Sequence, residues 1–267
     1  MKQYIFAPEY ERTDEGWVVF PRDTELRRRL FPYTDPAEHI AKANMLMVQA
    51  LVECFTDEGE TILDPFAGTG TVLVACTLNR KVVMMELVET FVQTIELNTI
   101  GVKQSYPMVE DLSTLIPGDA YSILPIPDFC DHLVFSPPYP MGLKKKGDMD
   151  KTSKDLGYSQ ATEYSEDPRN FTNLNDFIYH QKIELFYKKC YQTLRFGGTM
   201  TVIIKDKMEK GQRIMQADRT LRDCERIGFE LLQRNKWLAR GGGYSSINRA
   251  AGLETVDDED LITLRKV

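Results

Sequence analysis

Two short motifs in this sequence have the residue types and the spacing that a binding site needs. The first follows the apolar stretch TILD at residues 61–64. It consists of Asp64, Pro65, Phe66, Ala67, Gly68, Thr69, Gly70 and Thr71. Glycines at a strand-to-helix turn let the backbone approach a ligand closely, and the free amides at the start of the helix point outward as donors. The motif therefore predicts a cofactor-binding turn.

An acidic residue follows at the position that such a turn requires. Glu86 ends the next apolar run, KVVMME, 18 residues after Gly68 (86 − 68). At the tip of the second strand an acidic side chain can accept hydrogen bonds from a ribose diol. The turn is neither GxGxxG nor GxxxxGK[ST], so a dinucleotide or a nucleoside triphosphate is not indicated. A cofactor with a nucleoside but no pyrophosphate fits better.

The second motif is Ser136, Pro137, Pro138 and Tyr139, which directly follows the apolar run DHLVF. Two prolines stiffen the chain and remove two amide donors, which leaves carbonyl groups as acceptors. An exocyclic base amine needs acceptors on its N–H groups before it can attack a methyl carbon. Ser136 and the Pro137 carbonyl can supply them, and Tyr139 offers a face for an extruded base. In isolation, the motif is also typical of a proline-rich loop after a core strand.

The elements that must position both motifs follow from periodicity. We expect strands at residues 61–64, 81–86 and 131–135, with helices at about 71–79 and 88–98. Alternating strands and helices imply a parallel sheet with right-handed crossovers, whose carboxyl edge binds ligands. Later elements are a helix at about 174–194, a Gly-Gly turn at 197–198 and the strand TMTVIIK. A helix through Leu221 and Ile227 and strands at about 229–238 and 261–264 complete the pattern.

Together the two motifs resemble those of the DNA amino-methyltransferases, which make N4-methylcytosine and N6-methyladenine. DPFAGTG is similar to the cofactor loop of that family, and SPPY is similar to its catalytic motif. The resemblance implies an α/β Rossmann-like class I methyltransferase fold, with a mostly parallel seven-stranded sheet and helices on both faces. It also implies S-adenosyl-L-methionine as cofactor. Because the Ser variant is associated mainly with cytosine N4 methylation, that base is favoured.

Further segments extend the resemblance over roughly residues 36–205. His39 and Lys42 lie in HIAK, which is similar to the family's HPAK segment and implies contacts with the methionine end of the cofactor. Asp119 and Ala120 follow Gly118 and resemble the GD pair whose acidic residue contacts the adenine. Without the family, Asp119 is equally a turn residue and His39 a surface residue. The cofactor loop precedes the catalytic motif, an order less usual among SPPY members.

The resemblance implies direct methyl transfer to a flipped base of double-stranded DNA, without a covalent enzyme intermediate. Three alternatives stay open. The chain can be an N6-adenine DNA methyltransferase, an RNA amine methyltransferase, or a catalytically silent binding subunit. The recognition sequence, the oligomeric state and the presence of a cognate restriction endonuclease, as in restriction-modification systems, also stay open.

A net charge of −7 means that DNA contacts must come from a local basic patch. Candidate patches are residues 27–29, 144–146 and 205–207, although each of them taken alone is more typical of a solvated charged face. Residues 141–174 form a long polar stretch in the single predicted domain 1–267, and we expect it to be a target-recognition insertion. The DNA-binding candidates in that stretch are Lys144, Lys145 and Lys146, with Lys151, Lys154, Tyr158 and Tyr164 nearby. Arg240, beside a glycine run and Tyr244, is a further candidate.

The composition gives expectations about metal binding, membrane insertion and location in the cell. The five cysteines are far apart and only three histidines accompany them, so we expect reduced structural thiols and no metal. No run of about 18 apolar residues exists, so we expect no membrane span. The first 17 residues carry charges where a secretory signal needs an apolar run, and we expect a cytoplasmic protein.

Overall fold

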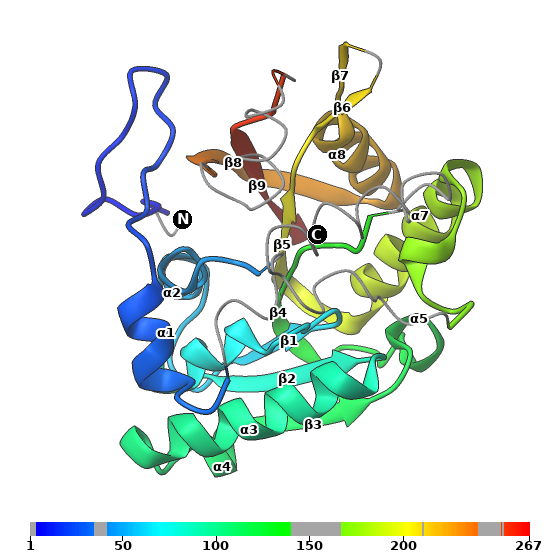
Figure 1. The fold of residues 1–267 in the computed structure, drawn as a ribbon. Helices are drawn as coiled ribbons and strands as arrows, with labels where there is room; N and C mark the ends of the chain where they lie inside the picture. The colour runs from blue at the N-terminus through cyan, green and yellow to red at the C-terminus, as the bar shows by residue number, and fades with distance from the viewer. Residues whose placement is uncertain (1–3, 35–41, 140–166, 210, 240–251, 253) are drawn as a thin grey trace.

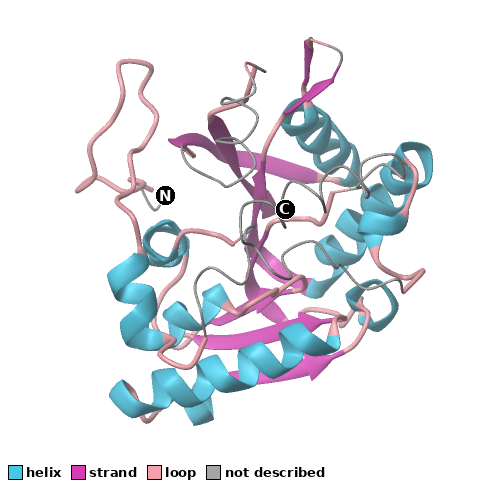
Figure 2. Ribbon diagram, viewed as in Figure 1, coloured by secondary structure: helices cyan, strands magenta, loops and turns pink. Residues whose placement is uncertain are grey.

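The structure is a computed structural model of the 267-residue chain. It describes residues 4–34, 42–139, 167–209, 211–239, 252 and 254–267. In these ranges a central sheet carries helices on both faces (Figures 1 and 2).

The central sheet has seven strands in the order β3-β2-β1-β4-β5-β9-β8. The strands are β1 (Thr61–Asp64), β2 (Lys81–Glu86), β3 (Ser113–Pro117), β4 (Cys130–Phe135), β5 (Leu194–Ile204), β8 (Phe229–Leu238) and β9 (Asp258–Lys266). The first five pair in parallel, and β9 is antiparallel to both β5 and β8. A separate small hairpin, β6 (Lys207–Glu209) and β7 (Gln212–Ile214), follows β5. The predicted mostly parallel, seven-stranded sheet is confirmed.

Helices connect these strands across both faces. They are α1 (Thr24–Leu30), α2 (Met45–Phe55), α3 (Glu89–Ser105), α4 (Val109–Leu112), α5 (Ala120–Ile123), α7 (Asp176–Thr193) and α8 (Gln216–Ile227), with the 3₁₀ helices η1 (Thr71–Leu78) and η2 (Phe171–Asn173). Alternation along each strand creates two cores, since successive side chains point to opposite faces. Ile62 and Val82 pack into one core, whereas their neighbours Leu63 and Val83 pack into the other.

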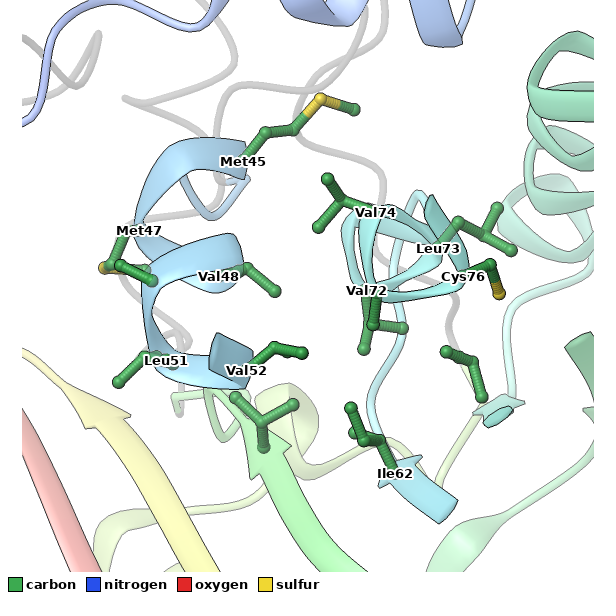
Figure 3. Close-up of a cluster of buried hydrophobic side chains, with 14 of the residues drawn as sticks. Met45, Met47, Val48, Leu51, Val52, Ile62, Val72, Leu73, Val74 and Cys76 are labelled. Carbon is green, nitrogen blue, oxygen red and sulfur yellow. The ribbon is translucent and has the colours of Figure 1, made fainter. Parts of the chain in front are cut away.

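The first core joins α2 to η1 over the sheet (Figure 3). Met47, Leu51 and Val52 of α2 are fully buried, as are Leu73 and Ile62. Asn44 caps α2 by accepting hydrogen bonds from Leu46 N at 2.8 Å and Met47 N at 3.3 Å. This packing fixes the start of α2 next to the turn that follows β1.

The predicted strands β1 and β2 have the expected bounds, but several other predictions differ in detail. The helix expected at 71–79 is a 3₁₀ helix, and the helix expected at 88–98 continues to Ser105. The expected Gly-Gly turn is a bulge inside a longer β5. Cys130 pairs with Leu194 and His132 pairs with Thr199. Between these two pairs β5 therefore has three more residues than β4, and the bulge accommodates them. Gly197 supplies the necessary left-handed conformation with φ of 78°.

No helix in the described ranges is long and apolar enough to cross a membrane. All five cysteines are free; Cys54 is half-buried and the others are buried.

His132 is a polar residue in the first core. Its ring stacks on Phe55, with the centroids 6.2 Å apart. Its Nδ1 shares a hydrogen bond of 2.7 Å with Thr199 Oγ1, while Nε2 is buried without a partner among the described residues. Burial lowers the pKa of His132 to about 3, from an ordinary value of 6.5. Folding therefore requires the neutral imidazole.

Replacing His132 by Leu should reduce the acid sensitivity of the fold. The unfolded imidazole binds a proton near pH 6.5 and the folded one only near pH 3, so stability is lost as the pH falls from about 6.5 toward 3. We expect the drop in Tm between pH 7.5 and pH 5 to be smaller for His132→Leu than for the unmodified protein.

The matched control is Thr199→Val, which removes the same hydrogen bond but keeps the imidazole. It should lower Tm at both pH values and retain the full acid-induced drop. An unchanged drop in His132→Leu would show that other groups cause the acid sensitivity.

Candidate functional site

A cavity of about 390 Å³ opens at the carboxyl edge of the parallel strands. Both sequence motifs line it, because β1 and β4 are neighbours that run in the same direction. From the first motif come Asp64, Pro65, Phe66, Ala67, Gly68, Thr69 and Thr71, and from the second come Ser136, Pro137, Pro138 and Tyr139. Glu86, Asp119, Ala120 and Lys42 also line the cavity. The volume lies within the range of small-molecule sites.

Glu86 at the end of β2 organises the turn after β1. One carboxylate oxygen accepts Gly68 N–H at 2.7 Å, and the other accepts Val88 N–H at 2.8 Å. The Leu87 amide is a third donor to this carboxylate, which leaves part of its acceptor capacity for a ligand. Burial raises the pKa of Glu86 despite these hydrogen bonds. The carboxylate thus holds the turn in place and can still accept from a hydroxyl group in the cavity.

The rest of the turn is held from behind. Asn98 on α3 is fully buried; its Nδ2 donates to Thr69 O at 2.8 Å, and its Oδ1 accepts from Thr34 Oγ1 at 2.8 Å. Gly70 has a φ of 76°, and it lies behind the cavity wall, where an added Cβ would be 3.1 Å from Ile95. Of the eight residues of the motif, Gly70 alone is absent from the lining, so its role is to shape the turn.

Asp64 brings a second carboxyl group into the cavity. It accepts Phe66 N–H at 3.0 Å. Burial raises the pKa of Asp64 to about 7, the hydrogen bond from Phe66 opposes this shift, and the nearby Glu86 adds to it. Two carboxyl groups in one apolar cavity favour a cationic ligand, whose charge would stabilise both ionised forms.

Ser136 and Tyr139 form the opposite wall. Ser136 is exposed and hydrogen-bonds to the Tyr139 hydroxyl group, which also accepts Lys205 N–H at 2.9 Å. Burial raises the pKa of Tyr139 well above 10, so the phenol remains protonated. The tyrosine is therefore fixed at both its backbone and its hydroxyl end, and it is not a base at neutral pH.

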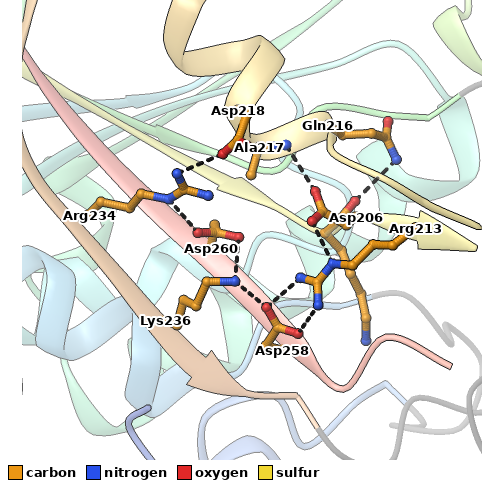
Figure 4. A network of polar contacts seen from close by, with 10 residues as sticks. Asp206, Arg213, Gln216, Ala217, Asp218, Arg234, Lys236, Asp258 and Asp260 are labelled. Atoms are coloured by element: carbon orange, nitrogen blue, oxygen red, sulfur yellow. Dashed lines mark hydrogen bonds and ion pairs between the residues drawn. The ribbon is translucent and has the colours of Figure 1, made fainter. Parts of the chain in front are cut away.

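The end of β5, which anchors Tyr139, is itself fixed by a network of ion pairs (Figure 4). Arg213 donates to Asp206 at 2.8 Å and to both oxygens of Asp258 at 2.9 and 2.6 Å. Asp258 also pairs with Lys236. Burial opposes ionisation of Asp258, but the hydrogen bonds from Arg213 and Lys236 lower its pKa to about 2. The network joins β5, β7, β8 and β9 beside the cavity.

Asp119 lines the cavity at the other end, after β3. Its Oδ1 accepts Tyr121 N–H at 3.0 Å, and its Oδ2 accepts the Ser122 hydroxyl at 2.6 Å. Both interactions lie within the short helix α5, so Asp119 acts as the cap of that helix. As in Glu86, the remaining lone pairs are available to a ligand.

Sequence reasoning missed the apolar lining. Leu87, Val88 and Phe91 follow Glu86 directly, and their position after the strand could have revealed them. Phe171 packs edge-on against Phe66 at 5.7 Å and belongs to an aromatic wall with Phe186. The residues Arg169, Asn170, Phe171 and Thr172 return to the cavity from far along the chain, and no local pattern marks them.

Several predicted residues lie outside the described residues: His39, Lys144, Lys145, Lys146 and Arg240, with most of the predicted insertion 141–174. The basic patch at 27–29 was partly wrong, because Arg27 is 3% exposed and pairs with Asp23. In the patch at 205–207, Asp206 is buried and Lys207 pairs with Asp176 and Glu209. Among the described residues, no group of three or more His, Cys, Asp or Glu side chains could hold a metal ion.

The fold is that of the Rossmann-like class I methyltransferases. TrmN from Thermus thermophilus is similar with a TM-score of 0.51 and 18% identity, covering 91% of this chain and 53% of TrmN. The glycopeptide N-methyltransferase MtfA, solved with S-adenosyl-L-homocysteine, has a TM-score of 0.51 at 13% identity, covering 97% and 100%. The [4+2]-cyclase SpnF has a TM-score of 0.53 at 14% identity, covering 94% and 98%. The chain spans about half the length of TrmN.

A sequence match covers the first part of the chain. Residues 6–97 match the family model of the N6/N4 methyltransferases, described as DNA methylase. The match includes the cofactor loop and ends before the SPPY motif. It supports the relationship to the DNA amino-methyltransferases that the motifs indicate, without distinguishing N4 from N6 members. No curated protein sequence matches the chain.

Replacing Asp64 by Asn should stabilise the fold at neutral and alkaline pH. The unfolded carboxyl group ionises near pH 3.8 and the folded one near pH 7, so ionisation costs stability progressively between these values. Asn keeps the acceptor for Phe66 N–H and avoids this cost. We expect Tm of Asp64→Asn to exceed that of the unmodified protein above pH 7, with a gain that shrinks toward pH 4. A pH-independent gain would contradict the raised pKa.

Proposed function

We propose that this protein is an S-adenosylmethionine-dependent DNA methyltransferase that methylates an exocyclic amine, with cytosine N4 favoured. The observation that carries the proposal is the shared cavity: the turn after β1 and the turn after β4 line the same space. A methyl donor on the first turn and a base amine on the second turn are then close enough to react.

The cavity residues suit the cofactor. Glu86 has lone pairs for the ribose diol, and Asp119 has them for the exocyclic amine of the adenine. Leu87 and Val88 supply an apolar surface for the adenine ring. Asp64, whose pKa is raised by burial, lies where a positive charge would favour its ionised form. Lys42 lines the wall that we assign to the methionine carboxylate.

When bound, S-adenosylmethionine supplies an electrophilic methyl group on a sulfonium. The Ser136 hydroxyl and the Pro137 carbonyl accept hydrogen bonds from the two N–H groups of the amine, which directs its lone pair at that methyl carbon. The Tyr139 ring lines the cavity with its hydroxyl held by Lys205 N–H, so its face is fixed for stacking on the base. Transfer would form the C–N bond as the C–S bond of the sulfonium breaks, with neutral S-adenosylhomocysteine as the leaving group and the displaced proton released to solvent. Positioning supplies most of the rate.

The DNA is held, we propose, by the insertion 141–174. Its lysines, Lys144 to Lys146, would contact phosphates, and Arg240 would contribute from a second loop. In the sequence, the insertion begins at residue 141, shortly after Tyr139, which lines the cavity. A cognate restriction endonuclease is compatible with this function.

The decisive experiment incubates the protein with labelled S-adenosylmethionine and unmodified plasmid DNA, then identifies modified nucleosides by mass spectrometry. We expect N4-methylcytosine. N6-methyladenine would overturn the choice of base but keep the reaction class. Transfer to RNA but not DNA would overturn the substrate. Cofactor binding without transfer to either would favour a silent binding subunit, since a fold alone does not imply an activity.

Ser136→Ala should reduce kcat by about 100-fold, since loss of one positioned hydrogen-bonding group in an active site costs that order. The Kd for S-adenosylhomocysteine should not change, because the serine lies on the base side of the cavity. Rates come from initial velocities with saturating DNA and cofactor. The control is Ser113→Ala, whose hydroxyl bonds to Val109 O away from the cavity. An unaffected kcat in Ser136→Ala would remove the proposed role.

Changing Lys144, Lys145 and Lys146 together to Glu should weaken DNA binding while leaving cofactor affinity unchanged. If each lysine neutralises a phosphate, the slope of log K against log salt concentration should become shallower by roughly 3. Fluorescence anisotropy with a labelled duplex at several salt concentrations measures this slope. Unchanged DNA affinity would discard the insertion as the DNA-binding element.

A further inference from the structure

Arg27 on α1 is a buried cation that lies directly behind the cavity without lining it. Its Nη2 donates to Asp23 Oδ2 at 2.6 Å and to Ala43 O at 2.8 Å. Its Nη1 donates to Thr71 Oγ1 at 3.4 Å. Its Nε is buried without a partner among the described residues. One guanidinium group therefore links three segments that are distant in the sequence.

Two of these segments form part of the cavity wall. Ala43 precedes α2 and Thr71 begins η1, and both line the cavity. Asp23 strengthens the link, because the oxygen that pairs with Arg27 also accepts Met45 N–H at 2.9 Å. Asn44 donates to Pro21 O at 2.9 Å, which attaches the same segment to the start of α1. We call Asp23 and Arg27 the clasp, since they hold the Ala43 and Thr71 walls together.

The clasp is not needed to fill the core. A buried ion pair commonly contributes little net stability, because the desolvation of both ions offsets their attraction, and an apolar residue of similar volume often replaces it without loss. Here the cost is increased by the unpartnered Nε. An apolar residue cannot reproduce the planar guanidinium group, whose N–H donors hold Ala43 and Thr71 at fixed positions.

The clasp also lies at a defined end of the cavity. Glu86 ends β2, while Gly118 and Asp119 follow β3, and these three residues form the end that suits the ribose and adenine. The other end of the ligand would contact the segment before α2 and the start of η1, which line the cavity through Lys42, Ala43 and Thr71. This assignment rests on the proposed function, which supplies the nucleoside-containing cofactor.

We propose that Arg27 is a positioning residue for the amino-acid tail of the cofactor: through Asp23, Ala43 and Thr71 it sets the wall that the tail contacts, while the nucleoside end is held independently. Loss of Arg27 should therefore weaken binding of ligands that carry the tail and leave binding of the nucleoside alone unchanged. A general loss of structure would weaken both.

The test compares two ligands that differ in the tail, S-adenosylhomocysteine and 5′-methylthioadenosine, by isothermal titration calorimetry on the full chain. For Arg27→Met we expect the Kd of S-adenosylhomocysteine to rise roughly tenfold, the scale of one hydrogen bond to a charged group. The Kd of 5′-methylthioadenosine should stay within about twofold. In turnover, KM for S-adenosylmethionine should rise with little change in kcat.

The matched control is Arg80→Met. Arg80 is also buried and bonds to Thr56 Oγ1 at 3.1 Å and Thr56 O at 2.9 Å, but neither residue lines the cavity. Both affinities should be unchanged in this variant. If Arg27→Met does not fold, Arg27→Lys replaces it. Lysine keeps the charge and the pairing with Asp23 but lacks the planar guanidinium group. We expect a smaller rise in the Kd of S-adenosylhomocysteine, again with little change for 5′-methylthioadenosine.

The outcomes separate the two proposals. If the unmodified protein binds neither ligand, the proposed function fails and the inference fails with it. If it binds both, but the substitutions at Arg27 change both affinities equally or change neither, the proposed function stands and the inference is overturned.

Discussion

The parallel pairing of β1 with β4 is the constraint on which the site depends. Leu63 of β1 pairs with Leu133 of β4, so the two strands end at the same edge of the sheet and run in the same direction. The register is fixed at its start as well, since Asp131 on β4 accepts Thr61 N–H at 2.8 Å. A shift of this pairing would separate the turn after Asp64 from the turn after Phe135. This pairing brings the two turns together. The other contacts of the site, including that of Glu86 from the neighbouring β2, adjust their positions.

Two buried carboxyl groups give the cavity its electrostatic character. Glu86 accepts hydrogen bonds from the amides of Gly68, Val88 and Leu87, whereas Asp64 accepts one, from Phe66. The pKa values of both are raised by burial. Ionisation of these two groups therefore costs free energy, which a cationic ligand would reduce and an anionic ligand would increase. This asymmetry favours a sulfonium cofactor over a phosphate-containing one, in agreement with a turn that lacks the phosphate-binding patterns.

The sequence was sufficient for the parts of the fold that rest on local signals. β1 and β2 are short strands with an apolar centre and a polar or charged residue at each end, so their bounds were predictable. The shape of the cavity was not, because it depends on contacts between distant segments. Asn98 ends the helix expected at about 88–98, where no sequence pattern marks a role at the site, yet its side chain donates to Thr69 O. Arg27 looked like part of a surface basic patch, yet it is buried. Phe171 follows a long polar stretch that gives no indication of where the chain returns.

The division of the sheet suggests where specificity arises. β1, β2 and β3 carry the groups suited to a nucleoside, and the same fold serves both methyltransferases and a cyclase. The distinguishing groups must then lie on the side of β4 and β5, where Tyr139 is held by the backbone of Lys205. There Arg213, Arg234 and Lys236 are all engaged with buried aspartates. These cations stabilise the carboxyl edge of the sheet, but because they are paired with aspartates they contribute little to binding phosphates. Under the proposed function, a protein of net charge −7 must therefore bind DNA through the loops around this edge, so that different residues provide the affinity for DNA and the alignment of the base.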